Sequence, residues 1–134
     1  MCIRDRWVER DLLDAVEKEG IGVIAFSPLA QGLLTDRYLQ GIQEVSRASK
    51  TWGFLKPEQV APALEKVKEL NEIAQQRGQS LAQMAIAWLL KDQRVTSVLI
   101  GASSVKQLAN NLDAQKNLYF STEELHQIEA ILKK

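Results

Sequence analysis

The residue types best suited to chemistry in this 134-residue chain form a small polar turn, Gly101-Ala102-Ser103-Ser104. The turn follows a β-branched run and precedes a helical pattern. A turn between a strand and a helix presents backbone N–H groups and the positive end of a helix dipole, so a phosphate is its natural ligand. Serines in such a turn also cap helices that bind nothing. On these residues alone, phosphate binding and simple capping both remain open.

A second candidate is the long segment between Ser27 and Pro57, which contains three glycines but no sustained periodicity. Loops longer than about 12 to 15 residues in compact domains are usually functional or disordered. Eight-stranded parallel barrels often build a phosphate site from the loops that follow their last two strands. The segment is therefore predicted to be a cofactor loop.

Other residues that could do chemistry are few. The single cysteine, Cys2, excludes an intrachain disulfide and a cysteine-cluster metal site. His126 is the only histidine and is predicted to lie on the surface of the last helix. The acidic residues near the N-terminus are better explained by a solvated helix face: Glu9, Asp11 and Asp14. The sequence therefore predicts no metal site.

The hydrophobic pattern predicts alternating helices and strands. A helix over Asp11 to Glu19 should end at Gly20, and Ile21 to Phe26 should form a strand buried on both faces. A helix that Pro57 can open should end at Gly78. Its inward stripe is Leu64, Val67, Leu70 and Ala74.

The second half of the chain repeats this alternation. Ser80 and Gln83 form a capping box for an apolar helix, and Val95 to Ile100 forms the second strand. Ser121 and Glu124 cap the last helix. Three apolar faces are expected to point inward: Leu81, Met84, Ala85, Trp88 and Leu89; Leu108 and Leu112; and Leu125, Ile128 and Leu132.

Strands joined by crossover helices should be parallel neighbours in an α/β sheet. Two strands alone leave backbone groups unpaired at both edges and an apolar face without an opposing layer. The pattern therefore predicts the C-terminal portion of a TIM (β/α)8 barrel, an incomplete barrel holding the last two strands with their helices. A small independent α/β domain fits less well.

The net charge of zero gives no electrostatic support for binding nucleic acid or a membrane surface. No apolar run approaches the ~20 residues that span a bilayer, and cysteine usage suits a reducing cytoplasm. Residues 1–5 read as a non-native leader, so that the genuine protein would be residues 6–134.

Three separated segments resemble the aldo/keto reductase family, and in particular its bacterial aldehyde reductases. They are Ala25 to Tyr38, Gln75 to Leu89 and Ser97 to Asn111. The first is similar to the family's loop after the seventh strand, and the third to its eighth strand and the start of the helix that grips the cofactor. The resemblance covers Arg6 to the C-terminus.

This resemblance implies an NADP site. The residues implied to line the nicotinamide ribose and pyrophosphate are Phe26, Ser27, Pro28, Leu29 and Gln31, with Arg37 near the phosphates. Those implied to hold the adenosine end and its 2′-phosphate are Gly101, Ser103, Gln107 and Asn111. Asn110 stands where relatives usually carry a glutamate that meets the adenine amino group. An amide oxygen accepts that hydrogen bond less strongly than a carboxylate. Arg47 falls near another family contact.

The resemblance also implies the activity. An intact relative transfers hydride from NADPH to a small-molecule aldehyde or ketone, using an aspartate, tyrosine, lysine and histidine from the first half of the barrel. Tyr38, Tyr119 and His126 do not match those positions, so no catalytic residue is expected here and the chain alone is expected to be inactive. The alternative is a nucleotide-binding regulatory subunit of the potassium-channel β-subunit type. The oligomeric state leaves no mark in the sequence.

Overall fold

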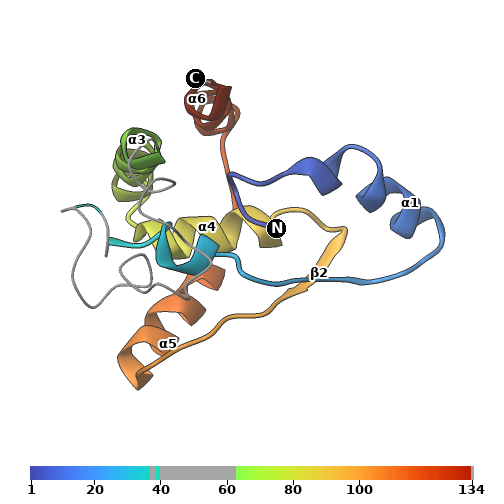
Figure 1. The fold of residues 1–134 in the computed structure, drawn as a ribbon, viewed down its shortest axis with the longest axis horizontal. Coiled ribbons are helices and arrows are strands. Elements are labelled where there is room, and N and C mark those ends of the chain that lie inside the picture. Colours follow the sequence, from blue (N-terminus) through green and yellow to red (C-terminus); the bar gives the residue numbers. More distant parts are fainter. Residues whose placement is uncertain (37–38, 40–62, 134) are drawn as a thin grey trace, which may run out of the picture. The chain divides into compact units, whose positions relative to one another are not determined.

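The computed structural model describes residues 1–36, 39 and 63–133. Its elements run in the order α1 (Leu12–Lys18), β1 (Val23–Ala25), α3 (Leu64–Gln76), α4 (Leu81–Leu90), β2 (Val95–Val98), α5 (Val105–Leu112) and α6 (Thr122–Lys133) (Figure 1). Short 3-10 turns lie at Trp7–Glu9, Ala30–Gly32 and Asp113–Lys116. The chain divides into two units, Met1–Pro28 with Gln83–Tyr119 and Leu29–Ala82 with Phe120–Lys134. The expected start of a helix at Pro57 lies outside the described residues.

The first unit contains a parallel pair of strands, β1 and β2, as the sequence predicted. Val23 pairs with Val95 and Ile24 pairs with Ser97, so Thr96 is an extra residue in β2. The Thr96 hydroxyl oxygen accepts from the Val23 backbone N–H at 3.1 Å. A Cβ on Gly22 would lie 2.8 Å from that same oxygen. A glycine at this position therefore permits the close approach of the segment before β1 to strand β2.

The prediction that the first strand is buried on both faces is wrong. Ala25 is 4% exposed, whereas Ile24 on the opposite face is 62% exposed. Neighbouring strand residues point to opposite faces, and only one face of this two-stranded sheet is covered in the described residues. A run that is apolar on both faces predicts burial on both sides, and here only one side is covered in the described residues.

The prediction that Leu108 and Leu112 of α5 point inward is also wrong, since Leu108 is 42% exposed and Leu112 is more exposed still. The buried residue of this helix is Asn111, at 2% exposure. The apolar stripe of α5 thus meets no covering layer among the described residues, and a polar amide takes the packed position.

Charged side chains tie α1 to the start of β2 within the first unit. Arg94 pairs with Asp14 on α1, and its Nη2 lies 2.7 Å from the Asp92 carboxylate. The hydrogen bond from Arg94 holds the pKa of Asp92 below its ordinary value. Helix α1 ends at Lys18, and Gly20 follows it with a φ of +67°, which confirms the left-handed terminator. Leu13 is buried, but Leu12 is exposed.

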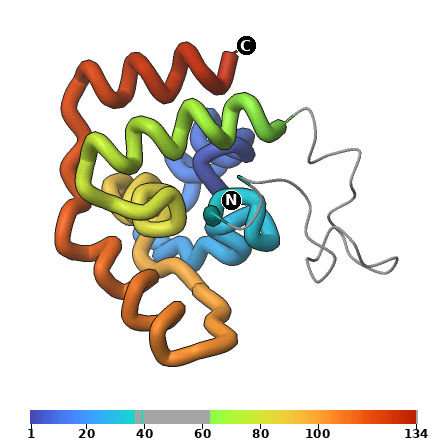
Figure 2. Tube along the Cα trace, turned by 90° about the vertical axis from the view of Figure 1, so that its left-hand side faces the viewer, coloured from blue at the N-terminus to red at the C-terminus, as the bar shows by residue number. Residues whose placement is uncertain are grey.

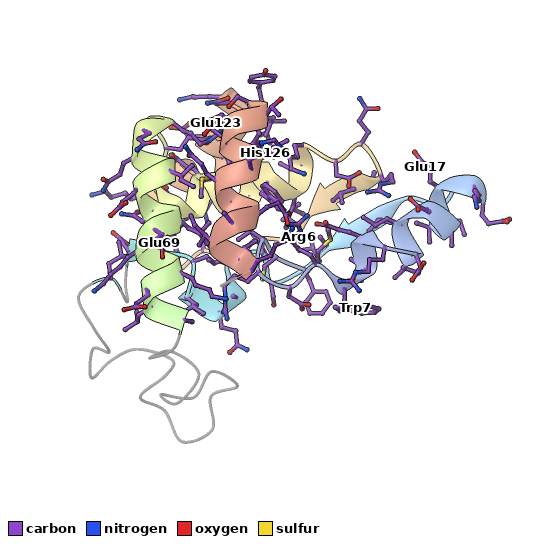
Figure 3. All side chains as sticks on the ribbon, turned by 90° about the horizontal axis from the view of Figure 1, so that it is seen from above. Arg6, Trp7, Glu17, Glu69, Glu123 and His126 are labelled. Carbon is purple, nitrogen blue, oxygen red and sulfur yellow. The ribbon has the colours of Figure 1, made fainter. Side chains whose placement is uncertain are left out.

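The first residues also belong to this packed unit. Ile3 is fully buried, and the Cys2 and Asp5 backbones form a small bridge. Trp7 by contrast projects from the N-terminal segment and is exposed (Figure 3). That residues 1–5 are a non-native leader stays a prediction.

The second unit is built on α3 and α6, which lie side by side and antiparallel (Figure 2). At one end the Lys66 ammonium donates to the Leu132 carbonyl oxygen at 3.1 Å. At the other end the Arg77 Nη1 lies 2.8 Å from the Glu124 carboxylate. The Arg77 guanidinium also stacks on the Phe120 ring, 3.7 Å from its centroid. These contacts at both ends fix the pairing of the two helices.

The termini of these helices confirm the sequence signals. Glu124 accepts from the Ser121 backbone N–H at 2.7 Å, and the Ser121 hydroxyl accepts from the Glu124 N–H at 3.2 Å, a capping box. Gly78 follows α3 with a φ of +67°. The predicted inward stripe of α6 is partly correct, since Ile128 and Ile131 are the buried pair. Leu125 and Leu132, which were expected inward, are half-buried.

The burial of α4 is confirmed, because Leu81, Met84, Ala85, Trp88 and Leu89 are all nearly inaccessible. In α3 the buried residues are Val67, Leu70, Ile73 and Ala74. Leu64, expected on the same stripe, is half-buried.

Candidate functional site

Two candidate loops of the first unit leave the same edge of the sheet. Because β1 and β2 are parallel, their carboxyl ends meet at one edge. The Leu99 N–H donates to the Ala25 carbonyl oxygen at 2.8 Å, which continues the pairing to the end of both strands. Phe26 and Leu99 then begin the two loops with exposed side chains. The structure therefore brings the Phe26-Ser27-Pro28 segment and the Gly101 turn to one edge.

The turn after β2 assigns different roles to its two serines. Ser104 is the N-cap of α5, and its hydroxyl oxygen accepts from the Gln107 N–H at 3.2 Å. Ser103 does not cap the helix. Its backbone N–H and its hydroxyl donate to one atom, the Gln107 Oε1, at 2.7 and 3.0 Å.

This convergence has a chemical meaning. Two donors aim at a single oxygen in front of a helix N-terminus, which is the arrangement that accepts a phosphate oxygen. In this structure the Gln107 amide oxygen occupies that position. Beside it, a Cβ built on Gly101 meets no atom within 4 Å, so the turn has open space on that side.

Ser27, at the end of the first-unit part of the loop after β1, has a φ of +54°. A positive φ is uncommon for a residue other than glycine and costs on the order of 1 to 3 kcal/mol. Ser27 is exposed and the next residue, Pro28, is buried. Strain of this kind clusters at ligand-binding sites.

The continuation of this loop in the second unit is strained as well. Ala30 and Gln31 have φ values of +46° and +59°, followed by Gly32 at +96°. The Leu29 carbonyl oxygen accepts from Gly32 N–H at 2.9 Å and from Leu34 N–H at 3.1 Å, which closes the turn. Leu29 and Gln31 are half-exposed. Arg37, Tyr38 and Arg47 lie outside the described residues.

The two asparagines near the end of α5 differ in environment. Asn111 is buried, and its Nδ2 has no hydrogen-bond partner among the described residues. Burying an amide donor without an acceptor costs about 1 to 3 kcal/mol, so this group is suited to an incoming acceptor. Asn110 is exposed, and its Oδ1 accepts from Gln83 Nε2 at 3.1 Å.

The spacing of Ser80 and Gln83 predicts only a capping box, and it gives no signal for the contact of Gln83 with Asn110. The two residues are 27 positions apart on different helices, and no local spacing signals their proximity.

The remaining candidates carry no site in the described part of the chain. His126 is exposed on α6, as expected (Figure 3). No group of three or more metal-ligating side chains is found in the described residues. No helix in that part of the chain has the length and hydropathy to cross a membrane.

Comparison with known proteins bears on this arrangement. L-glyceraldehyde 3-phosphate reductases from Escherichia coli O157:H7 and from Escherichia coli strain K12 are each 56% identical over 131 residues. Each match covers 93% of this chain and 38% of the relative. The chain thus spans well under half the length of these curated relatives. The resemblance to bacterial aldehyde reductases is confirmed.

A solved structure shares the fold. A thermostable aldo-keto reductase in complex with the inhibitor epalrestat matches with a TM-score of 0.66 and 27% identity, over 98% of this chain and 37% of that one. Two parallel strands with their helices are consistent with part of that enzyme's barrel. The aldo/keto reductase family model matches residues 1–133, and this chain therefore belongs to the aldo/keto reductase family.

Proposed function

We propose that this chain forms the cofactor-binding part of an NADP-dependent oxidoreductase that reduces small-molecule aldehydes or ketones. The observation that carries the proposal is the convergence of the Ser103 N–H and hydroxyl on one oxygen position at the N-terminus of α5. A 2′-phosphate oxygen would replace Gln107 Oε1 there. The freed Gln107 side chain could then turn its amide donor toward the phosphate.

Two further features of the first unit support binding of the rest of an NADP molecule. Open space beside Gly101 admits a ligand, and the buried Asn111 Nδ2 offers a donor to the adenosine end. The residues proposed to hold the nicotinamide ribose and pyrophosphate are Phe26, Ser27, Pro28, Leu29, Gln31 and Arg37. When bound, the cofactor supplies a hydride. The chain's own residues bind and orient it.

The chemistry is proposed to need more than this chain. Its curated relatives are much longer, and we assign the catalytic acid and its partners to a preceding part of a complete (β/α)8 barrel. The chain alone is then inactive. A small aldehyde is the proposed substrate class because the relatives carry the name L-glyceraldehyde 3-phosphate reductase. A cytoplasmic location suits NADPH chemistry.

A chimera tests this function. Residues 6–134 would be joined to the preceding portion of the Escherichia coli relative, replacing its matching C-terminal part. The expected result is NADPH-dependent reduction of L-glyceraldehyde 3-phosphate, with neither half active alone. A folded chimera that binds no NADPH would reject the cofactor role. A chimera that binds NADPH without turnover would contradict the proposal that this chain orients the cofactor for hydride transfer.

A further inference from the structure

Gln83 on α4 joins this helix to α5 within the first unit. Its Nε2 donates to the backbone carbonyl oxygen of Asn110 at 3.0 Å and to the side-chain Oδ1 of the same residue at 3.1 Å. One amide group therefore holds both the main chain and the side chain of a residue in the last turn of α5.

This contact adds to the burial of Asn111 in holding α5 in position. The last four carbonyl groups of a helix have no partner inside the helix, and Gln83 satisfies one of them. A helix of eight residues is far below the ~12 to 15 that form a marginally stable helix in water. The side chains of Leu108 and Leu112 are exposed, so apolar packing of that face contributes little. Polar contacts to α4 must therefore supply part of the positioning.

The two ends of α5 carry the groups of the proposed nucleotide site. Ser103 and Gln107 form the anion position at its start, and Asn111 places its buried amide near its end. Asn110 lies directly before Asn111 in the same turn. Any rotation or fraying of this turn moves the Asn111 amide relative to the Ser103 donors.

We propose that Gln83 is a positioning residue for the adenosine end of the nucleotide site, acting through Asn110. This inference rests on the proposed function. In this proposal, Asn110 anchors α5 to α4 through its backbone carbonyl oxygen and its side-chain Oδ1, which both accept from Gln83. Nucleotide affinity then depends on a side chain of α4 that reaches the site only through α5.

The test uses the full chain with adenosine 2′,5′-bisphosphate as the probe. Gln83→Met keeps the side-chain length but removes the donor, and Gln83→Lys restores a donor. Gln127→Met is the matched control, because Gln127 is an exposed residue that donates to Glu123 on its own helix, at 3.2 Å. The dissociation constant should rise about two- to tenfold in Gln83→Met, the loss expected for one neutral hydrogen-bonding group. Gln83→Lys should recover most of the affinity, and the control should not change it.

Hydrogen exchange separates the inference from the proposed function. Amides of residues 105–116 should exchange faster in Gln83→Met than in wild type, with α6 unchanged. Unchanged exchange in α5, or an unchanged dissociation constant, would overturn the positioning role. Wild-type chain that does not bind the bisphosphate would contradict the proposed function and the nucleotide role of Gln83, while faster α5 exchange would still support Gln83 as the anchor of α5.

Discussion

Replacing Ser103 by alanine should weaken binding of a 2′-phosphorylated nucleotide while sparing its unphosphorylated counterpart. The Ser103 hydroxyl is one of two donors aimed at the proposed phosphate position, 3.0 Å from the oxygen that now occupies it. The alanine variant loses this donor but keeps the backbone N–H. The perturbation is therefore confined to one hydrogen bond of the anion position.

The magnitude follows from an exchange of partners. A hydrogen bond to a charged group is worth about 1.5 to 3 kcal/mol, and the exposed neutral bond to Gln107 that it replaces about 0.5 to 1 kcal/mol. The net loss is about 0.5 to 2.5 kcal/mol, which is roughly a 2- to 70-fold rise in the dissociation constant.

Isothermal titration of the chain with adenosine 2′,5′-bisphosphate and with adenosine 5′-monophosphate measures this difference. Ser104→Ala is the matched control, because the neighbouring Ser104 is the N-cap of α5. Losing a cap costs about 1 kcal/mol of stability and should affect both nucleotides alike. Equal losses of both nucleotides in Ser103→Ala, or a selective loss in Ser104→Ala, would refute the assignment of roles to the two serines.

Three further outcomes are expected. Arg77→Ala should lower the free energy of unfolding in urea by about 3 kcal/mol, because it leaves the partly buried Glu124 without its ion pair. Lys133→Ala removes an exposed 3.9 Å ion pair and should cost under about 0.5 kcal/mol. Similar costs for the two variants would contradict this difference. Burial raises the pKa of Glu124, but hydrogen bonds from Ser121 and Arg77 outweigh it and hold the pKa below its ordinary 4.5. The carboxylate's contribution should thus be full above pH 4.5 and fall away as the pH drops through the lowered pKa, and a Glu124→Gln variant whose unfolding shows the same acid dependence as wild type would refute it. The purified chain should oxidise no NADPH with a small aldehyde above a heat-killed control. Protein-dependent turnover would disprove the proposal that the catalytic residues lie in a preceding part of the barrel.

Much of the fold was predictable because its signals are local. The capping box of Ser121 and Glu124 and the terminators Gly20 and Gly78 each depend on residues within one turn. The parallel pairing of the strands followed from the crossover helices between them. Such features need no knowledge of distant contacts.

What the sequence could not predict depends on tertiary surroundings. Ile24 and Leu108 are apolar residues on predicted inner faces, yet both are exposed. Hydrophobic periodicity identifies an apolar face but does not show whether another layer covers it. The distinction between Ser103 and Ser104 required the position of the Gln107 side chain. The Gln83 contact joins two helices and has no local signature. The candidate nucleotide residues were found from family resemblance, and their roles in binding stay predictions.

The central claim is that the turn before α5 recognises the 2′-phosphate of an adenosine nucleotide. An ¹⁵N NMR titration of the wild-type chain with adenosine 2′,5′-bisphosphate and with adenosine 5′-monophosphate tests it most directly. The account predicts binding of the bisphosphate about tenfold or more tighter, with the largest shifts at the amides of Gly101, Ser103 and Gln107. Equal affinity for the two nucleotides, or shifts that leave these amides unmoved, would contradict it.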